Sequence, residues 1–357
     1  MLSPVSLGGL WMRLLVVGTG RMAINHAKAF QTIAGVEIVG AVDPDPAGLA
    51  AYAQTFGVPR TFATLQAALD WGQFDAVDNI TPDAVHHATT LACLAAGKHV
   101  LCEKPLATDH RLAFEMVAAA EAAGVVNMVN LTYRNVAELH AARDLVASGA
   151  IGTVKHVEAS YLQHWVALRD FSDPGPWLWR LSSAHGSNGT LGDIGIHIID
   201  FTTFAINQPI VAMTCRLQTF AKVPGDRIGA YVLDANDSFV ISAEFGNGAI
   251  GTIHSSRWAS GHANDQRLRV YGEKGGIELS HGHWGTLLRV CVGEDVASAT
   301  WREVTAPPVR SNYERFADAV HAGRQEQPDF RHAAELQKVL DLALLAGADH
   351  KEHRVSA

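Results

Sequence analysis

Short apolar runs alternate with segments of helical composition through the first 130 residues of the chain. The apolar runs are continuous and short, as in strands that are buried on both faces. They cover residues 12–17, 36–42, 75–80, 99–102 and 125–130. The helical segments between them cover residues 24–32, 47–56, 83–96 and 112–123. This alternation predicts an α/β domain with a parallel, doubly wound sheet over residues 12–131.

The pattern changes in the second half of the chain. Residues 153–163 alternate between apolar and polar positions, and residues 210–292 are rich in β-branched and aromatic residues. Asn247-Gly248 between two such stretches is a strong hairpin signal. Helical periodicity returns at 311–323 and 331–348. We therefore expect an α+β domain over residues 132–357, with an open, mostly antiparallel sheet whose last helices pack back towards the first domain.

Composition and charge exclude several classes of protein. The 357 residues are 48% hydrophobic and 18% charged, as in a folded protein with a large core. The net charge of −8, without a basic stripe, argues against binding to nucleic acid. No apolar run approaches the length that spans a bilayer, and residues 1–11 lack the features of a secretory signal. We expect a disordered extension at 1–11, with Met12 as an alternative start, and a cytoplasmic location with four free, mostly buried cysteines.

A glycine-rich turn follows the first predicted strand. Gly18 permits a tight turn, Gly20 lets the backbone approach a pyrophosphate, and the helix that follows presents its N-terminal N–H groups. Arg21 and Met22 lie in the same turn and are expected at the cofactor, although Arg21 could equally be solvated. Asp43 ends the second strand, where a carboxylate binds ribose hydroxyls and repels a 2′-phosphate. The sequence therefore predicts a nicotinamide cofactor, NAD rather than NADP.

Two further segments carry residues suited to catalysis. Lys104 follows a predicted strand at its carboxyl end, where open α/β sheets bind ligands. Asp193 and His197 are four residues apart, so a helix would present both on one face. Taken alone, these could be a solvated lysine and an ordinary helix-face pair.

Four segments together resemble the Gfo/Idh/MocA oxidoreductase family: GTGRMA, NITPDAVH, CEKP and GDIGIHIID, in this order. The resemblance covers nearly the whole chain. It implies a nicotinamide-binding domain followed by an open antiparallel sheet, with substrate bound between them. It also implies that Lys104, Asp193 and His197 are catalytic and that a cis bond precedes Pro105. The positions that line the dinucleotide in the family correspond to Thr81, Pro82, His86 and Glu103.

A finer resemblance, to the levoglucosan-dehydrogenase-type branch, lies in the segments 132–134, 161–165 and 179–180. That branch oxidises sugars and anhydrosugars, commonly at the C3 hydroxyl. Aromatic rings and arginine suit sugars, because rings pack on C–H patches and guanidinium donates to hydroxyls. The expected substrate residues, besides Asp193 and His197, are Tyr133, Arg134, Tyr161, Gln163, Trp165 and Arg180. Plain packing in the sheet is the alternative for Tyr161 and Trp165.

The expected reaction is oxidation of a secondary hydroxyl. Either Lys104 or His197 could act as the formal base, and the sequence does not decide between them. No metal site is expected, since His281 and His283 lack partners at ligand spacing. Two other functions stay open: a glycosidase that uses a transient 3-keto intermediate, and a non-catalytic nicotinamide-binding regulator. A homodimer or homotetramer through the second sheet is also expected, since an open apolar sheet face would otherwise be exposed.

Overall fold

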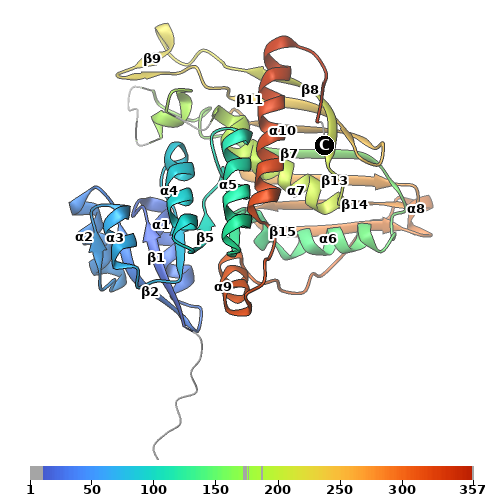
Figure 1. Ribbon diagram of the computed structural model, residues 1–357. Helices are drawn as coiled ribbons and strands as arrows, with labels where there is room; N and C mark the ends of the chain where they lie inside the picture. Colours follow the sequence, from blue (N-terminus) through green and yellow to red (C-terminus); the bar gives the residue numbers. More distant parts are fainter. Residues whose placement is uncertain (1–10, 172–174, 176, 186–187, 356–357) are drawn as a thin grey trace, which may run out of the picture. The chain divides into compact units, whose positions relative to one another are not determined.

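The computed structural model describes residues 11–171, 175, 177–185 and 188–355 (Figure 1). The expected extension at 1–11 therefore lies, except for Trp11, outside the described residues. The chain divides into two compact units, and each is described by itself. Unit 1 comprises residues 1–132 and 310–335, and unit 2 comprises 133–309 and 336–357. Helix α10 (Phe330–Asp349) begins in the first unit and ends in the second.

Unit 1 contains a six-stranded parallel sheet in the order β3-β2-β1-β4-β5-β6. Its strands are β1 (Met12–Val17), β2 (Val36–Val42), β3 (Thr61–Phe62), β4 (Ala76–Asn79), β5 (His99–Cys102) and β6 (Asn127–Val129). Its helices are α1 (Arg21–Phe30), α2 (Pro46–Phe56), α3 (Leu65–Trp71), α4 (Asp83–Ala95), α5 (His110–Ala123) and α9 (Asn312–Ala322). The doubly wound sheet is thus confirmed. The sequence analysis predicted neither the short β3 nor α3.

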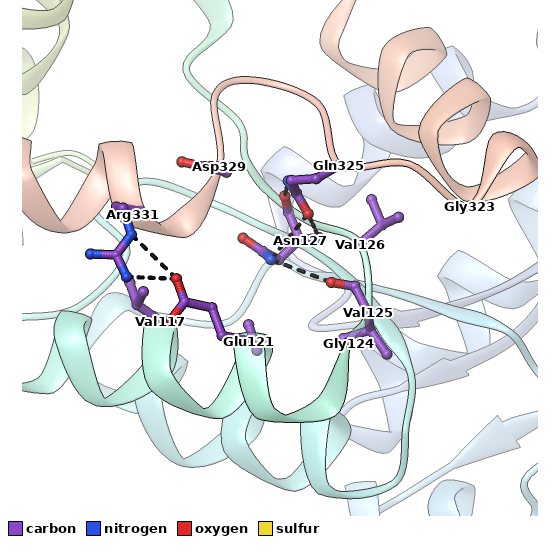
Figure 2. Close-up of a pocket in the computed structure, with 11 residues that line it drawn as sticks. Val117, Glu121, Gly124, Val125, Val126, Asn127, Gly323, Gln325, Asp329 and Arg331 are labelled. Atoms are coloured by element: carbon purple, nitrogen blue, oxygen red, sulfur yellow. Dashed lines mark hydrogen bonds and ion pairs between the residues drawn. The ribbon is translucent and has the colours of Figure 1, made fainter.

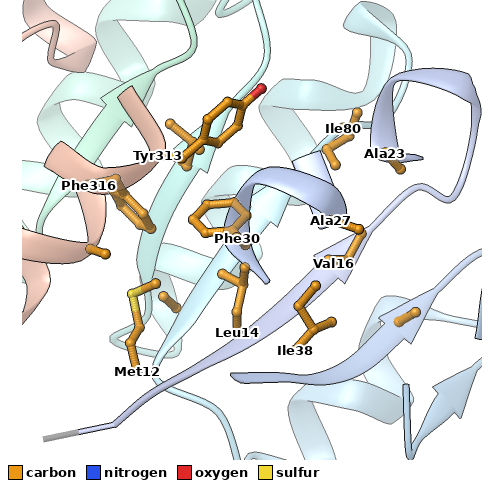
Figure 3. Packing of buried hydrophobic residues seen from close by; sticks show 14 of the residues in the cluster. Met12, Leu14, Val16, Ala23, Ala27, Phe30, Ile38, Ile80, Tyr313 and Phe316 are labelled. Atoms are coloured by element: carbon orange, nitrogen blue, oxygen red, sulfur yellow. The ribbon is translucent and has the colours of Figure 1, made fainter. Parts of the chain in front are cut away.

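The core of unit 1 includes a segment from far along the chain. Tyr313 and Phe316 of α9 pack beside Phe30 of α1 and the buried residues of β1 (Figure 3). Helix α9 is amphipathic and begins with a capping box between Ser311 and Glu314. The sequence analysis assigned residues 310–335 to the second domain. They belong to unit 1, because α9 buries its apolar face there.

Polar contacts hold the connection after α9 against the start of β6. The backbone N–H of Asn127 donates to Gln325 Oε1 at 3.0 Å, and Arg331 pairs with Glu121 at 2.6 Å (Figure 2). These residues line a pocket of about 260 Å³. The pocket lies at the amino end of β6, whereas ligands of doubly wound sheets bind at the carboxyl ends. Of the described residues that line it, none is an expected cofactor residue.

Unit 2 is built on a nine-stranded sheet in the order β16-β15-β14-β13-β7-β12-β11-β8-β17. Its strands are β7 (Val154–Gln163), β8 (Ile210–Gln218), β11 (Ser238–Phe245), β12 (Ile250–Ser256), β13 (Ala263–Gly272), β14 (Gly275–Gly282), β15 (Gly285–Val292), β16 (Arg302–Glu303) and β17 (His353–Arg354). A separate two-stranded ribbon joins β9 (Arg227–Ile228) and β10 (Tyr231–Val232). All pairs in the large sheet are antiparallel except β7 with β12. The hairpin expected at Asn247-Gly248 joins β11 to β12, so the mostly antiparallel sheet is confirmed.

Helices lie on one face of this sheet (Figure 1). Helix α6 (Ala137–Ala147) contacts β14 and β15, and α7 (Ile196–Ile206) contacts β7, β12 and β13. The short α8 (Asp295–Ser298) lies beside β15. Near the end of α10, Gly347 approaches β8 so closely that a Cβ atom would lie 2.7 Å from Leu217. One face of the sheet is therefore covered by helices, among them α7, which carries His197.

Candidate active site

The turn after β1 in unit 1 requires glycine at its first position. Gly18 has φ +92°, and a Cβ atom there would lie 2.8 Å from the carbonyl oxygen of Ile80. Gly20 precedes α1, and the space where its Cβ would point is open for 4 Å. No side chain caps the N-terminus of α1, and its first two residues, Arg21 and Met22, are exposed. A turn of this shape fits a pyrophosphate group.

Asp43 lies beside this turn, at the end of β2. Its Oδ2 accepts hydrogen bonds from the backbone N–H of Thr19 at 2.7 Å and from the Thr19 hydroxyl at 2.9 Å. Its Oδ1 accepts from the backbone N–H of Asp45 at 2.9 Å. Burial raises the pKa of Asp43, but these hydrogen bonds outweigh burial and lower it overall. The carboxylate is therefore charged and fixed, and since two oxygens offer about four acceptor positions it retains acceptor capacity.

His86 has a different environment from the one expected. It is 1% exposed, and its ring nitrogens lie 2.8 Å from the carbonyl oxygen of Pro105 and 2.7 Å from that of Thr81. It therefore joins the loop after β4 to the loop after β5. Thr81 and Pro82 lie in the first of these loops, and Thr81 donates its hydroxyl to Asn79 at 2.7 Å. The structure thus places Thr81 and Pro82 at the carboxyl edge of the sheet, with His86 buried beneath them.

Glu103 and Lys104 follow β5 directly. Glu103 is 8% exposed, and its Oε1 lies 3.0 Å from Nε2 of His26. Its Oε2 accepts the backbone N–H of Lys104 at 3.1 Å. The Lys104–Pro105 bond is cis, as the family resemblance implied. The Lys104 backbone is thus held by a buried carboxylate, while its side chain is partly exposed.

The second group of expected residues lies in unit 2, around a π-helical turn (Leu191–Gly195) that leads into α7. The sequence analysis expected Asp193 and His197 on one regular helix. Asp193 instead lies in the π turn, and His197 lies in the first turn of α7. Such π turns are frequent at functional sites. Close packing accompanies this turn, since a Cβ at Gly195 would lie 3.0 Å from the ring of Phe239.

Two arginines hold the carboxylate of Asp193. Arg257 Nη2 lies 2.8 Å from Asp193 Oδ2, and Arg180 Nη1 donates to the same oxygen. Arg257 is completely buried, and its Nη1 also donates to the carbonyl oxygen of Arg180 at 3.0 Å. Burial lowers the pKa of the Arg257 guanidinium, although the charge of Asp193 opposes this. Asp193 is therefore an ion-paired carboxylate.

A chain of polar side chains lies next to His197. The ring of Tyr133 meets that of His197 edge-on at 5.1 Å, and its hydroxyl lies 2.6 Å from the hydroxyl of Tyr161. Tyr161 donates to Asn264 Oδ1 at 3.1 Å, and Gln163 Nε2 donates to the same atom at 2.5 Å. Trp165 Nε1 in turn donates to Gln163 Oε1 at 2.9 Å. Burial raises the pKa of both tyrosines, which keeps their hydroxyls protonated.

Arg134 is placed differently from the other expected substrate residues. It is 3% exposed, and its Nε and Nη2 donate to the carboxylate of Asp200 at 2.7 and 2.6 Å. Its guanidinium also lies 3.7 Å from the centre of the Phe204 ring. Both partners belong to α7, so these contacts position that helix. Arg134 therefore supports α7, and its contact with substrate stays a prediction.

Sequence reasoning missed Arg257 and Asn264. Alternation along β12 places residues 251, 253 and 255 on the buried face, and the same period places Arg257 there. A charged residue at a position that alternation buries requires a partner, and that signal could have led to Asp193. Asn264 has φ +62° at a shift in the register between β13 and β7, which no sequence pattern indicates.

Neither a metal site nor a membrane span is found among the described residues. No three His, Cys, Asp or Glu side chains of that part of the chain are grouped as ligands of one ion. No helix in the same residues combines the length and the apolar character needed to cross a bilayer. The four cysteines are free and buried, as expected from their spacing.

Both halves of the chain match models of one protein family. Residues 12–131 match the model described as oxidoreductase family, NAD-binding Rossmann fold, and residues 139–278 match the GFO/IDH/MocA C-terminal domain. The chain belongs to the Gfo/Idh/MocA oxidoreductase family. This membership confirms the family resemblance, and it makes the first unit an NAD-binding domain.

Similar proteins act on sugars. Levoglucosan dehydrogenase of Pseudarthrobacter phenanthrenivorans is 28% identical, over 74% of this chain and 73% of that protein. D-glucoside 3-dehydrogenase of Escherichia coli is also 28% identical, over 76% of this chain and 78% of that protein. Among solved structures, an oxidoreductase domain protein from Kribbella flavida has a TM-score of 0.86 and 29% identity, covering 98% of this chain and all of that one.

Proposed function

We propose that the protein is an NAD-dependent dehydrogenase that oxidises the C3 hydroxyl of a pyranose sugar or anhydrosugar to a ketone. The observation that carries this proposal is the group formed in unit 2 by His197 and the linked polar side chains of Tyr133, Tyr161 and Gln163. Phenol and amide groups of this kind match the hydroxyls of a sugar ring, and the aromatic rings match its C–H patches. The names of the two relatives support the same class of substrate.

The residues that would hold NAD lie in unit 1. The N–H groups at Gly20, Arg21 and Met22 would bind the pyrophosphate, and Asp43 would accept hydrogen bonds from the ribose hydroxyls. Thr81 and Pro82 would line the dinucleotide at the same edge of the sheet. Bound NAD supplies the acceptor for the hydride that leaves the substrate carbon. The charge on Asp43 supports NAD over NADP, because a fixed carboxylate repels a 2′-phosphate.

His197 takes the proton of the substrate hydroxyl. Imidazole is the side chain best suited to this near neutral pH. Asp193 is a poor proton acceptor by comparison, because two guanidinium groups stabilise its anionic form. It orients Arg180, which lies on the more exposed side of the carboxylate and donates to a second hydroxyl of the sugar. Lys104 donates to the reacting oxygen and stabilises its developing negative charge.

The test is a screen of monosaccharides, glycosides, anhydrosugars and inositols for reduction of NAD, followed by NMR assignment of the oxidised carbon. We expect NADH to accumulate with at least one pyranose and the product to be its 3-keto derivative. Lys104→Ala and His197→Ala should each lower turnover by more than about a hundredfold. Near-full turnover in both variants would refute the assignment. Cleavage of a glycoside without accumulation of NADH would identify the glycosidase instead, and binding of NADH without turnover would identify a regulator.

We also propose that the protein forms a homodimer or homotetramer through the uncovered face of the large sheet. Val240 of β11 and Ile250 of β12 are apolar and exposed there. Nearby, Arg269 pairs with Glu158 and Glu278. Apolar side chains between charged ones are common at interfaces between subunits.

A further inference from the structure

Unit 1 contains a buried charge cluster that includes Glu103, the residue before Lys104 in the chain. His26, in the middle of α1, is completely buried. Its Nδ1 lies 3.0 Å from Oδ2 of Asp78 on β4, and its Nε2 lies 3.0 Å from Oε1 of Glu103. One imidazole ring therefore joins the helix that follows the glycine turn to the ends of two adjacent strands.

Both ring nitrogens of His26 face carboxylate oxygens, so only the doubly protonated imidazolium donates to both. Burial lowers the pKa of His26, but the charges of Asp78 and Glu103 outweigh burial and raise it to about 10. Burial has the opposite effect on Glu103 and raises its pKa, but the hydrogen bond to His26 and the charge of His26 outweigh burial and lower this pKa to about 2. Burial raises the pKa of Asp78, and the charge of His26 opposes that rise. The contacts of both ring nitrogens with carboxyl oxygens and the raised pKa of His26 indicate a His26 cation, with Glu103 as its ionised partner.

Neutral groups complete the cluster and restrict the Glu103 side chain further. Asn130 Nδ2 lies 2.7 Å from Glu103 Oε1, 3.1 Å from the hydroxyl of Tyr313 and 3.1 Å from Nε2 of His26. The ring of Tyr313 meets that of His26 edge-on at 5.0 Å. Asn312 Nδ2 donates to Asn130 Oδ1 at 3.2 Å. Helix α9, which enters unit 1 from much later in the chain, therefore supports the same carboxylate.

Only one oxygen of Glu103 is used by this cluster. The other, Oε2, accepts the backbone N–H of Lys104. The position of the His26 ring therefore fixes the Glu103 side chain, and the Glu103 side chain fixes the peptide from which the Lys104 side chain extends. A buried carboxylate with fixed partners on both oxygens has little freedom to move.

We propose that His26 is a positioning residue that acts through Glu103 to fix the backbone of Lys104 relative to α1. The inference rests on the proposed function, because it gives Lys104 its role. It assigns no contact with substrate to His26 itself. Displacing a catalytic group by about 1 Å costs about a hundredfold in rate, so a cluster of this kind has a measurable effect on turnover.

The test compares His26→Gln with His99→Gln. His99 lies at the far end of β5, the strand that Glu103 follows, and its Nδ1 accepts the backbone N–H of Val126 at 2.9 Å. The control therefore makes the same substitution at a histidine outside the cluster. We expect His26→Gln to lower kcat at least about tenfold, with KM for the sugar and Kd for NADH changed less than about threefold. Hydrogen–deuterium exchange of a peptide over residues 102–107 should become faster in His26→Gln and stay unchanged in His99→Gln. Wild-type kcat with unchanged exchange in His26→Gln would overturn the proposal.

A second variant keeps the proposal testable if His26→Gln is too unstable to fold. His26→Gln leaves two buried carboxylates without their cation, so His26→Gln/Asp78→Asn removes one negative charge together with the positive one. We expect the double variant to recover stability but not kcat. If kcat recovers along with stability, His26 only neutralises the buried carboxylates, and the proposal is overturned.

Failure of the proposed function is recognised separately. If the wild type oxidises no sugar, or if Lys104→Ala keeps its turnover, the proposed function fails. The exchange measurement and the ¹⁵N shifts of the His26 ring still decide the inference. At about pH 8, above the ordinary pKa of histidine, the ¹⁵N shifts should report an imidazolium, and a neutral ring would overturn the inference.

Discussion

The two arginines on Asp193 differ in burial, and this difference predicts unequal effects on stability. Arg257 is completely buried, whereas the side chain of Arg180 is 27% exposed. At 2.8 Å and an effective dielectric of about 20, the attraction between Arg257 and Asp193 is about 6 kcal/mol before desolvation. Desolvation offsets much of this, and breaking one partner of a buried pair costs about 3–5 kcal/mol. The pair of Arg180 with Asp193 is partly open to solvent, so water screens it and it contributes less than the fully buried pair.

We therefore expect Arg257→Met to destabilise unit 2 by about 3–5 kcal/mol and Arg180→Met by about 1 kcal/mol or less. Methionine keeps an unbranched apolar stem in both variants, so each change removes chiefly the charge. Urea unfolding followed by tryptophan fluorescence is suitable, since Trp165 lies 5.1 Å from the Arg257 guanidinium. Activity should show the opposite order among folded molecules, with a larger rise in KM for the sugar in Arg180→Met. Equal destabilisation by the two variants would refute the reasoning.

Three further predictions follow from the structure. Asp43→Ser should weaken NAD binding about tenfold and strengthen NADP binding, because the variant loses the charge that repels a 2′-phosphate; fluorescence titration with both reduced cofactors measures this, and an unchanged preference contradicts the role of Asp43. The charge on His26 stabilises the fold fully below the ordinary histidine pKa of 6.5, and this contribution falls as pH rises towards 10; the contribution of Glu103 falls instead as pH drops from 4.5 towards 2. The free energy of unfolding should thus fall less between about pH 6.5 and pH 10 in His26→Gln/Asp78→Asn than in the wild type. Urea unfolding at several pH values measures this, and the same dependence on pH in both proteins would contradict it. Ile250→Glu should lower the mass measured by light scattering to that of a smaller assembly, whereas a wild-type monomer would exclude the proposed interface.

The sequence was most informative where backbone geometry alone decides the structure. Gly18 needs its positive φ and the close approach to Ile80, so its role follows from residue type. Strand β2 was predicted with its observed bounds, because its apolar residues are buried by neighbours on both sides. The start of α1 was placed three residues late, since Gly20 is its N-cap and no side-chain signal marks that position.

The sequence was least informative where contacts join distant segments. Nothing in the segment around Arg134 indicates that its Nε and Nη2 donate to Asp200, a contact that holds the arginine against α7. The π turn at Asp193 is equally invisible, because residues four apart give the same pattern in either kind of helix. Helix α9 brings Tyr313 against Phe30 in unit 1, although the two residues lie 283 positions apart in the chain.

The two units treat their carboxylates in the same way, and this explains why acidic residues beside the proposed catalytic groups are poor bases. Glu103 precedes Lys104 and is held by His26, and Asp193 precedes His197 by four residues and is held by Arg257. In each case a fully buried cation stabilises the anion, so protonating the carboxylate would leave that cation unpaired. A general base must take up a proton and release it in every cycle, which a carboxylate in this environment resists. The acidic residues therefore supply fixed geometry, and in the proposed mechanism the proton transfer falls to His197.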